Sequence, residues 1–371
     1  MTKNKLWLKS GGRCEYEGCN EPLWKDEVTM AELNAAYIAH IVSASPSEVR
    51  GNPIYSFQLS DDFQNLMLLC DIHHRLIDVE KPNEHTVELL KAMKLAHEQR
   101  IELLTGIHSD KKTEILMYGA NIGAQAAAIS YPKAIQAVLP KRYPTKSDGI
   151  SLSMKNSSFR DDDPTFWEVE KDNLKSLFEQ RVMISRQDGR APHVSIFALA
   201  PQPLLIYLGS LLSDLVEGEV FQLHREPQGW CWPETSVEID FVVEEPKIFN
   251  GCPVLILSLS ADITDQRVAD VMGDRDHSVW RVSIKNPNND FLKNQKCLLR
   301  FRIIMRSLLN KIKEKHGETE YVHIFPAAPV SVCVELGRVR MPKADLPFRI
   351  YDQKRGPERS GFFKALDIGN I

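Results

Sequence analysis

The sequence predicts two domains of different class: a small α+β domain, followed by a larger α/β domain that contains a repeated unit. Three observations indicate this. Cysteine and histidine residues lie at metal-ligand spacing within residues 14–73, which is typical of a small domain held together by a metal ion. Long apolar runs occur beyond residue 193, as expected for buried parallel strands. One stretch of 17 residues occurs there twice without gaps, which indicates a duplication.

Four residues of the first domain have the spacing of a tetrahedral zinc site. Cys14 and Cys19 form one pair, and Cys70 and His73 form a second. Zinc prefers four sulfur or nitrogen ligands, and it would stabilise a module whose apolar core is small. Coincidence or a disulfide is the alternative. The other cysteines stand singly in apolar surroundings, as expected of buried thiols in a reduced, intracellular protein.

A second set of polar residues lies beside this cluster and is not needed by zinc. His40 ends an apolar run that we expect to be a strand, and His74 directly follows the last zinc ligand and should begin a helix. We expect these elements to bring both histidines to one metal-sized gap. Asn65 either binds that metal or holds the His40 loop through its amide, and ordinary core histidines are the alternative. A neutral imidazole near pH 7 suits a base that activates water.

At these residues the chain resembles the HNH endonucleases. Their ββα-metal fold has paired cysteines, then His-Ile, then Asn-Leu-x-x-Leu-Cys-x-x-(Cys/His)-His, and the resemblance spans residues 10–104. It implies that His40 is the general base for hydrolysis of double-stranded DNA. It also implies that Asn65 and His74 bind a catalytic Mg²⁺ or Mn²⁺ ion. Many members carry Asp or His directly before the base, where this chain has Ala39, so Asp78 or a backbone carbonyl would have to complete the metal shell.

The charge distribution does not by itself indicate a nuclease. Acidic residues outnumber basic ones in the first 108 residues, and the whole chain has a formal net charge of −4. Lys3, Lys5, Lys9 and Arg13 form a basic arm that could contact phosphates, with a solvated charged terminus as the alternative. We therefore expect several copies to bind one duplex together.

The C-terminal two-thirds of the chain contains the duplicated unit. Residues 193–209 align without gaps on residues 321–337, and seven of the 17 positions are identical. Each copy has an apolar, β-branched run that ends in Ala-Pro, then an apolar run of helical period, then a second strand that opens at Phe221 or Phe348. This order predicts a strand–turn–helix–strand unit that is present twice. An old duplication without a ligand is the alternative to a binding function.

Further elements are expected between the two copies. The run 252–261 reads as a buried strand, a helix is expected from Thr264, and another strand at 280–284. Ligands of parallel sheets lie beyond the carboxyl ends of the strands. Two such units facing each other would form a pseudo-twofold crevice, which suits a ligand with two similar halves.

This half resembles the SAVED domain, in which two fused CARF-like Rossmann-type units bind cyclic oligonucleotide messengers. The resemblance spans residues 160–371 and is carried by 197–214, the Trp230-Cys-Trp232 run and 328–338. An HNH domain followed by SAVED is the order found in one group of CBASS antiphage effectors. It implies a DNA endonuclease that is switched on by a cyclic dinucleotide, such as a cyclic GMP-AMP. We expect a homo-oligomer, a dimer or tetramer, when the messenger is bound.

The residues that contact the messenger are expected among aromatic, basic and turn residues of this half. Trp230 and Trp232 could stack on bases, although alternation along a strand makes one of them an ordinary core residue. The Pro-Gln-Pro turn at Gln202 is expected to point that side chain into the crevice. Basic residues would contact the phosphates. The candidates are Gln202, Pro203, Arg225, Trp230, Trp232, Lys285, Pro326, Ala327, Arg338 and Arg355.

The expected boundaries are 1–107 for the HNH domain, 108–160 for a connector and 161–371 for the sensor domain. An Ala-rich run, 120–129, is expected to be helical, as is the amphipathic segment 165–182. No apolar stretch reaches the length of a membrane span, so a cytoplasmic protein without a membrane partner is expected. Two alternatives stay open: a nucleic-acid-binding regulator with an inactive HNH module, and an ungated restriction-type nuclease whose C-terminal half reads modified DNA.

Overall fold

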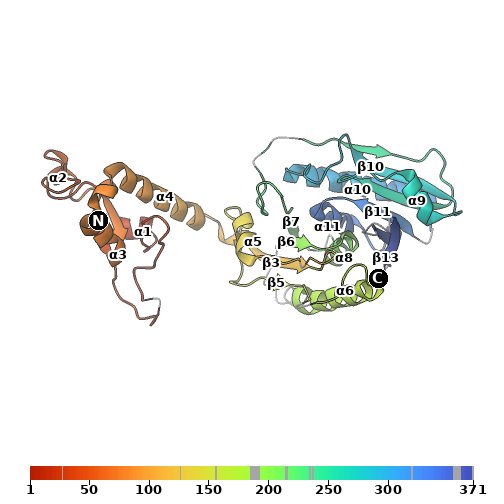
Figure 1. The fold of residues 1–371 in the computed structure, drawn as a ribbon, viewed down its shortest axis with the longest axis horizontal. Coiled ribbons are helices and arrows are strands. Elements are labelled where there is room, and N and C mark those ends of the chain that lie inside the picture. Colours follow the sequence, from red (N-terminus) through yellow and green to blue (C-terminus); the bar gives the residue numbers. More distant parts are fainter. Residues whose placement is uncertain are drawn as a thin grey trace. The chain divides into compact units, whose positions relative to one another are not determined.

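The chain divides into two compact units, Met1–His108 and Ser109–Ile371, in a computed structural model (Figure 1). The structure describes residues 1–26, 28–125, 127–154, 157–183, 193–213, 216–233, 235, 238–318, 321–353 and 361–369.

The first unit is built around a two-stranded antiparallel sheet. Strand β1 pairs with β2, so that Tyr37 lies opposite Leu69 and His40 lies opposite Leu66. The strand expected to end at His40 is therefore present, and a helix follows β2 as expected. The elements are α1 (Thr2–Lys9), β1 (Tyr37–His40), α2 (Tyr55–Gln58), η1 (Phe63–Asn65), β2 (Leu66–Leu69), α3 (Asp71–Arg75), η2 (Leu76–Glu80), η3 (Pro82–Glu84) and α4 (Val87–Thr105).

The apolar core of this unit is small. All four residues of β2, Leu-Met-Leu-Leu, are buried, and they pack with Leu6 of α1 and Leu90 of α4. Helix α4 begins at a side-chain cap, because the Thr86 hydroxyl accepts the N–H of Leu89 at 3.2 Å. A core of this size leaves little margin for a stable fold, which is the situation in which small domains use a metal ion.

The second unit contains two sheets. The first has the strand order β4-β3-β6-β7, with β5 also paired to β3, and the second has the order β13-β12-β11-β9-β10-β8. Their strands are β3 (Lys112–Gly119), β4 (Tyr143–Pro144), β5 (Ile150–Ser151), β6 (Val194–Leu199), β7 (Gly218–Val220), β8 (Phe241–Glu244), β9 (Cys252–Ser258), β10 (His277–Ile284), β11 (Val322–Ala327), β12 (Phe348–Gln353) and β13 (Phe362–Ile368). The helical segments are η4 (Ser109–Lys111), α5 (Tyr131–Val138), α6 (Pro164–Phe178), η5 (Glu179–Met183), α8 (Gln202–Leu212), α9 (Asp265–Met272), α10 (Gln295–His316) and α11 (Val330–Val339).

The pairing of the strands confirms the duplication. Strand β6 lies between β3 and β7 and is parallel to both, and β11 lies in the same way between β9 and β12. Helix α8 follows β6, and α11 follows β11. The strand and helix expected between the copies are β9 and α9, and the strand β10 follows them. The central strands are parallel, whereas the edge strands β8 and β13 are antiparallel to their neighbours.

The two repeats meet through α8 and α11, which lie side by side (Figure 1). A Cβ atom on Gly209 would lie 2.0 Å from the carbonyl oxygen of Val334, and one on Gly337 would lie 2.0 Å from that of Ile206. These glycines are the last residues of the 17-residue repeat in its two copies. The close approach of the helices is therefore itself duplicated, and it requires the absence of a side chain at both positions.

A connector was expected over residues 108–160, but residues 109–160 belong to the second unit. Strand β3 pairs with β6 from Glu114 to Gly119, so it is a central strand of the sheet. The described part of the Ala-rich run 120–129 is not helical. The Ala120 N–H instead bonds the carbonyl of Leu199, so the pairing of the sheet overrides the helix propensity of alanine. The helix expected at 165–182 is present as α6 and η5.

Glu170 of α6 places a carboxyl group in the core of the second unit. Its side chain is 1% exposed, and Oε2 has no hydrogen-bond partner in the part of the chain that the structure describes. Burial raises the pKa of this carboxyl to about 7. The native state therefore holds the proton more tightly than the unfolded state, so stability falls as the pH rises from the ordinary pKa of 4.5 to about 7.

Glu170→Gln is expected to remove this penalty. The substitution should raise the melting temperature at pH 8 by more than at pH 5. At pH 8 the wild-type protein carries a buried carboxylate charge that glutamine removes, whereas at pH 5 the buried carboxyl is already neutral. Glu168→Gln is the matched control, since Glu168 is exposed on the same helix. Thermal unfolding of both variants at the two pH values measures the effect, and an equal shift of Glu170→Gln at both would contradict it.

Candidate functional site

The four residues with zinc-ligand spacing come together in the first unit. Cys14, Cys19, Cys70 and His73 each offer one ligand atom, and these atoms all lie within 4.8 Å of one another. His73 Nδ1 is 3.1 Å from Cys70 Sγ and 3.7 Å from Cys14 Sγ. Three sulfur atoms and one nitrogen atom are a donor set that fits tetrahedral zinc.

The surrounding chain holds this cluster in place. The Cys14 N–H bonds the carbonyl of Glu21 at 2.9 Å, and the Cys19 N–H bonds that of Tyr16 at 3.1 Å, which forms the turn between the first two ligands. The Tyr16 ring stacks on His73 with centroids 4.1 Å apart. Burial raises the pKa of the Cys14 and Cys70 thiols. Thiolates at these positions therefore need a nearby cation, which zinc would supply.

We expect one tightly bound zinc ion per chain. Cys14→Ser should release it and unfold the first unit, since zinc binding in so small a domain is largely folding free energy, on the order of 10 kcal/mol. Metal analysis and far-ultraviolet circular dichroism measure the two effects. Cys231→Ser is the control, because Cys231 lies in the second unit and is exposed, where a buried thiol was expected. Well-folded protein without zinc would show that the cluster is not a structural metal site.

His40 lies at the end of β1, where its side chain makes a hydrogen bond to the backbone. Its Nε2 is 3.0 Å from the carbonyl oxygen of Ser60. A carbonyl oxygen only accepts hydrogen bonds, so Nε2 is the donor, and Nδ1 is the ring nitrogen that does not take part in this contact. Because the side chain is half-buried and held by this bond, Nδ1 has a fixed direction.

Asn65 holds the loop that follows His40 and does not face a metal site. It is 2% exposed, its Oδ1 accepts the Val42 N–H at 2.7 Å, and its Nδ2 donates to the carbonyls of Val42 at 3.0 Å and Leu59 at 3.1 Å. Of the two roles left open by the sequence, the structure gives it the second. The assignment of Asn65 as a ligand of the catalytic cation is corrected, because its amide is turned to the backbone on both sides.

His74 of α3 lies against the carboxylate of Asp78. The His74 Nε2 is 3.2 Å from Asp78 Oδ2, and its ring stacks on Tyr37 of β1 with centroids 4.9 Å apart. Ala39 is 1% exposed, so the position before His40 belongs to the core and offers no ligand. An imidazole nitrogen and a carboxylate oxygen this close to each other suit a shared divalent cation.

A buried arginine connects His40 with His74. Arg50 is 7% exposed, and it donates to the carbonyl of Ile41 at 3.0 Å, to that of Ile77 at 2.6 Å and to that of His40 at 3.4 Å. It also pairs with Asp78, the partner of His74. The Arg50 side chain therefore holds the end of β1 and the segment η2 together. The sequence did not single out this residue.

In the second unit, the carboxyl ends of β6 and β11 lead into the starts of α8 and α11. Gln202 Oε1 accepts the N–H of Ala328 at 3.2 Å, which crosses from the first repeat to the second. Gln222 Oε1 accepts the Ser331 hydroxyl at 2.7 Å and makes a second crossing. Gln202 is thus at the junction of the repeats, as expected, but its side-chain oxygen already accepts a hydrogen bond from the other repeat. Gln222 and Ser331 were not among the predicted residues, although Gln222 directly follows the repeated Phe221.

The structure separates the two tryptophan candidates. Trp230 is 4% exposed and packs its ring edge-to-face on Phe197 with centroids 5.3 Å apart, so it is the core residue of the pair. Trp232 is half-buried beside His224, with ring centroids 5.3 Å apart. The alternation anticipated from the sequence is therefore found, and only Trp232 presents a ring surface.

Several other candidates are corrected. Pro203 is buried in α8, and Pro326 and Ala327 pair with Leu257 and Ser258 inside the sheet. Arg338 is buried, where it pairs with Glu335 at 2.9 Å and donates to the carbonyls of Gly218 and Val216, so it fastens β7 and does not bind phosphate.

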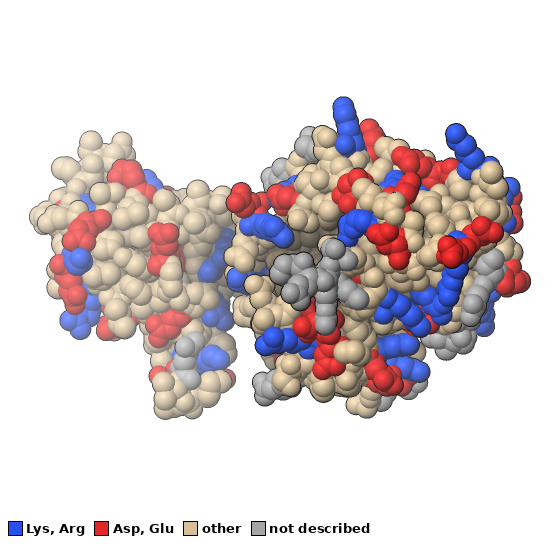
Figure 2. Space-filling model, turned by 45° about the vertical axis from the view of Figure 1, so that its right-hand side comes forward, with Lys and Arg blue, Asp and Glu red and all other residues tan. Residues whose placement is uncertain are grey.

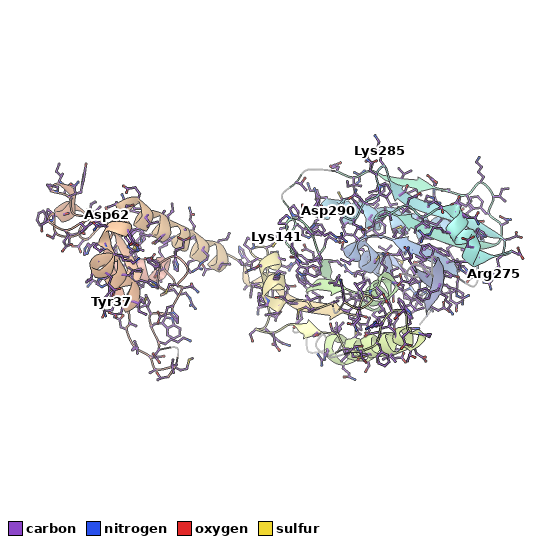
Figure 3. All side chains as sticks on the ribbon, in the orientation of Figure 1. Tyr37, Asp62, Lys141, Arg275, Lys285 and Asp290 are labelled. Carbon is purple, nitrogen blue, oxygen red and sulfur yellow. The ribbon has the colours of Figure 1, made fainter. Side chains whose placement is uncertain are left out.

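Arg225 and Lys285 are exposed, and Lys285 projects from the outer surface of the second unit (Figure 3). Arg355 lies outside the described residues. Acidic and basic side chains alternate over the visible face of this unit (Figure 2). This face therefore has no single positive patch that would by itself mark a site for an anion.

Comparison with protein families identifies the second unit. The family model of SAVED, the "SMODS-associated and fused to various effectors sensor domain", matches residues 174–368. This match covers more than half of the sequence, and the chain belongs to the SAVED family. No helix among the described residues is long and apolar enough to cross a membrane.

Similar solved structures include two of the Acinetobacter baumannii Cap4 SAVED/CARF-domain containing receptor. The one with the cyclic trinucleotide 2'3'3'-cAAA has 12% identity and a TM-score of 0.44, and the match covers 76% of this chain and 60% of that chain. The one with 3'3'3'-cAAA has 13% identity and a TM-score of 0.44, covering 87% and 62%. The Moraxella osloensis Cap4 receptor has 11% identity and a TM-score of 0.37, covering 85% and 70%. The chain spans about three-fifths of the length of the first of these. No curated protein matches.

Proposed function

We propose that this chain is a DNA endonuclease that a cyclic oligonucleotide switches on, as in CBASS antiphage defence. One observation carries the proposal: a SAVED sensor domain is joined to a separate unit in which a zinc-type cluster lies beside two histidines that the cluster does not use. The cluster alone would account for stability. His40, whose Nδ1 takes no part in the Ser60 contact, and His74, which lies against a carboxylate, are the residues left for chemistry.

The proposed reaction is hydrolysis of a DNA phosphodiester. His40 Nδ1 takes a proton from water as the water oxygen attacks phosphorus, the bond from phosphorus to the leaving oxygen breaks, and the leaving oxygen takes a proton from a second water molecule. Mg²⁺ or Mn²⁺, when bound, would neutralise the charge that develops on the phosphate oxygens. His74 Nε2 and Asp78 Oδ2 are the atoms that would hold the ion. Arg50 would hold the Asp78 carboxylate in position for the ion. It would not itself bind the ion, and Ala39 supplies no ligand.

The proposed messenger is a cyclic dinucleotide that lies at the junction of the repeats. Two helices with equivalent glycines start at this junction, and the positive ends of their dipoles favour a phosphate group. A ligand shifts an equilibrium only by its different affinity for two states. A messenger with two similar halves, bound to both repeats, would favour one angle between α8 and α11. We propose that the favoured form assembles into a homo-oligomer in the cytoplasm.

Messenger binding is expected to convert the protein into a larger oligomer and to raise its nuclease activity at the same time. Paired HNH sites would cut both strands, and several copies would give the acidic first unit affinity for DNA. Analytical ultracentrifugation beside a plasmid assay measures both effects, with a panel of cyclic dinucleotides and the two cyclic trinucleotides of the Acinetobacter structures. A tightly binding member of the panel that changed neither mass nor cleavage would overturn the proposed gate.

The position of Ala39 favours a second candidate function. A missing cation ligand next to the base is consistent with a nucleic-acid-binding regulator whose HNH module does not cut. The same plasmid assay separates the candidates: the regulator would bind DNA and leave it intact with every messenger. Equal cleavage with and without a messenger would instead indicate an ungated restriction-type nuclease.

A further inference from the structure

The second unit contains a cavity that shares no residue with the Gln202–Ala328 contact. Its volume is about 420 Å³, which lies within the range for pockets that hold one small molecule. Its walls are the end of α5 with the loop 139–142, the outer face of the first sheet, the segment 231–233 and the start of α10. Lys141 lies at this end of α5 (Figure 3).

The charges around this cavity are mainly positive. Lys141, Arg142 and Lys296 line it, against the single acid Glu219. Within the described residues, none of the three cations forms an ion pair, and Lys141 and Arg142 act on Glu219 by Coulombic attraction from a greater distance. Three cations and one carboxylate leave a local charge of about +2 in a chain whose net charge is −4. That charge matches a phosphate monoester near neutral pH.

The same cavity has an aromatic wall. Trp232 and Phe221 both line it. Trp232 is half-buried, so part of its indole ring is accessible. An indole ring at the wall of a cavity is a stacking surface for a nucleobase.

The start of α10 adds a third feature. This helix has 22 residues, and Asn294 caps it by accepting the Lys296 N–H at 2.9 Å. Its positive end therefore faces the same space as the three cations, which strengthens the preference for an anion. The cations, the aromatic wall and the helix end come from elements that are far apart in the sequence, and the fold brings them to one cavity.

We propose that this cavity is a second ligand site, specific for a nucleoside monophosphate. The phosphate lies at Lys141, Arg142 and Lys296, and the base stacks on Trp232. Phosphodiesters of a cyclic messenger carry one charge each, so the dianionic phosphate monoester fits the cavity better. Free phosphate would leave the aromatic wall without a contact. This site is separate from the junction of the repeats and goes beyond the proposed function.

Calorimetric titration of the full-length protein with AMP and GMP tests this site. One of the two is expected to bind, with the corresponding nucleoside and inorganic phosphate at least tenfold weaker. Lys141→Ala combined with Lys296→Ala is expected to weaken binding at least tenfold. Lys247→Ala combined with Lys343→Ala is the matched control, because these lysines are exposed and do not line the cavity.

Trp232→Leu gives an independent variant that keeps all charges, and it is expected to weaken the monophosphate more than inorganic phosphate. Melting temperatures of all variants show that each is folded. The proposal is overturned if neither monophosphate binds, or if inorganic phosphate binds as tightly as AMP and GMP. Equal affinity in the cavity variant and its lysine control would overturn it as well.

Discussion

His40→Ala is expected to lower plasmid cleavage by at least about 100-fold, the contribution of a general base. Zinc content, melting temperature and messenger binding should not change, because the imidazole is half-buried and, among the described residues, its one hydrogen bond is to the Ser60 carbonyl. His108→Ala is the matched control, since His108 is exposed at the end of the first unit. The assay measures nicked and linear plasmid with time at saturating messenger.

A readout beyond the rate separates the role of a base from a structural role. If His40 is the base, the dependence of the wild-type cleavage rate on pH should be lost in the His40→Ala protein. Cleavage by the variant at more than a tenth of the wild-type rate would assign the base to another residue.

Gly209→Ala is expected to have the second large effect. Its Cβ would overlap the Val334 carbonyl oxygen at 2.0 Å, so α8 and α11 must move apart, at a cost of about 1–3 kcal/mol or more in unfolding free energy. Since the messenger is proposed to bridge the two repeats, messenger binding and the activation of cleavage by the messenger should both be lost. Gly337→Ala should behave in the same way, because it is the equivalent position of the second repeat.

Gly369→Ala is the control for both substitutions. Gly369 has no atom within 4 Å of an added Cβ, and it lies in the same unit. Chemical denaturation measures the stability of the second unit, and messenger binding is measured by calorimetry. If Gly209→Ala and Gly369→Ala were equally stable and bound the messenger equally well, the close packing of α8 and α11 would not be part of the sensor.

Local patterns in the sequence predicted a large part of this fold. The zinc-type cluster was predicted because its ligands sit in two short turns, where spacing along the chain fixes their distance. The repeat was predicted because a duplicated strand and helix keep the same apolar period, and the structure confirms β6, α8, β11 and α11. The strand at His40 was predicted from its β-branched, apolar composition.

Other features depend on contacts between distant residues, and the sequence pattern could not decide them. The sequence left two roles open for Asn65, and only its contact with Val42 in the loop after β1 decides between them. Arg338 donates to the Gly218 carbonyl, which lies 120 positions earlier in the chain. The central strand β3 was missed because an Ala-rich run next to it suggested a helical connector. Its own run Ile115-Leu-Met-Tyr118 carries the apolar signal of a buried strand, so closer attention to that run could have found it.

The central claim is that one messenger controls the nuclease of the same chain. The most direct test is a titration of plasmid cleavage against messenger concentration, on the sample whose messenger binding is measured by calorimetry. The account predicts background cleavage without messenger and a rise that follows the occupancy of the sensor to saturation. Cleavage that stays constant from zero to full occupancy would contradict it.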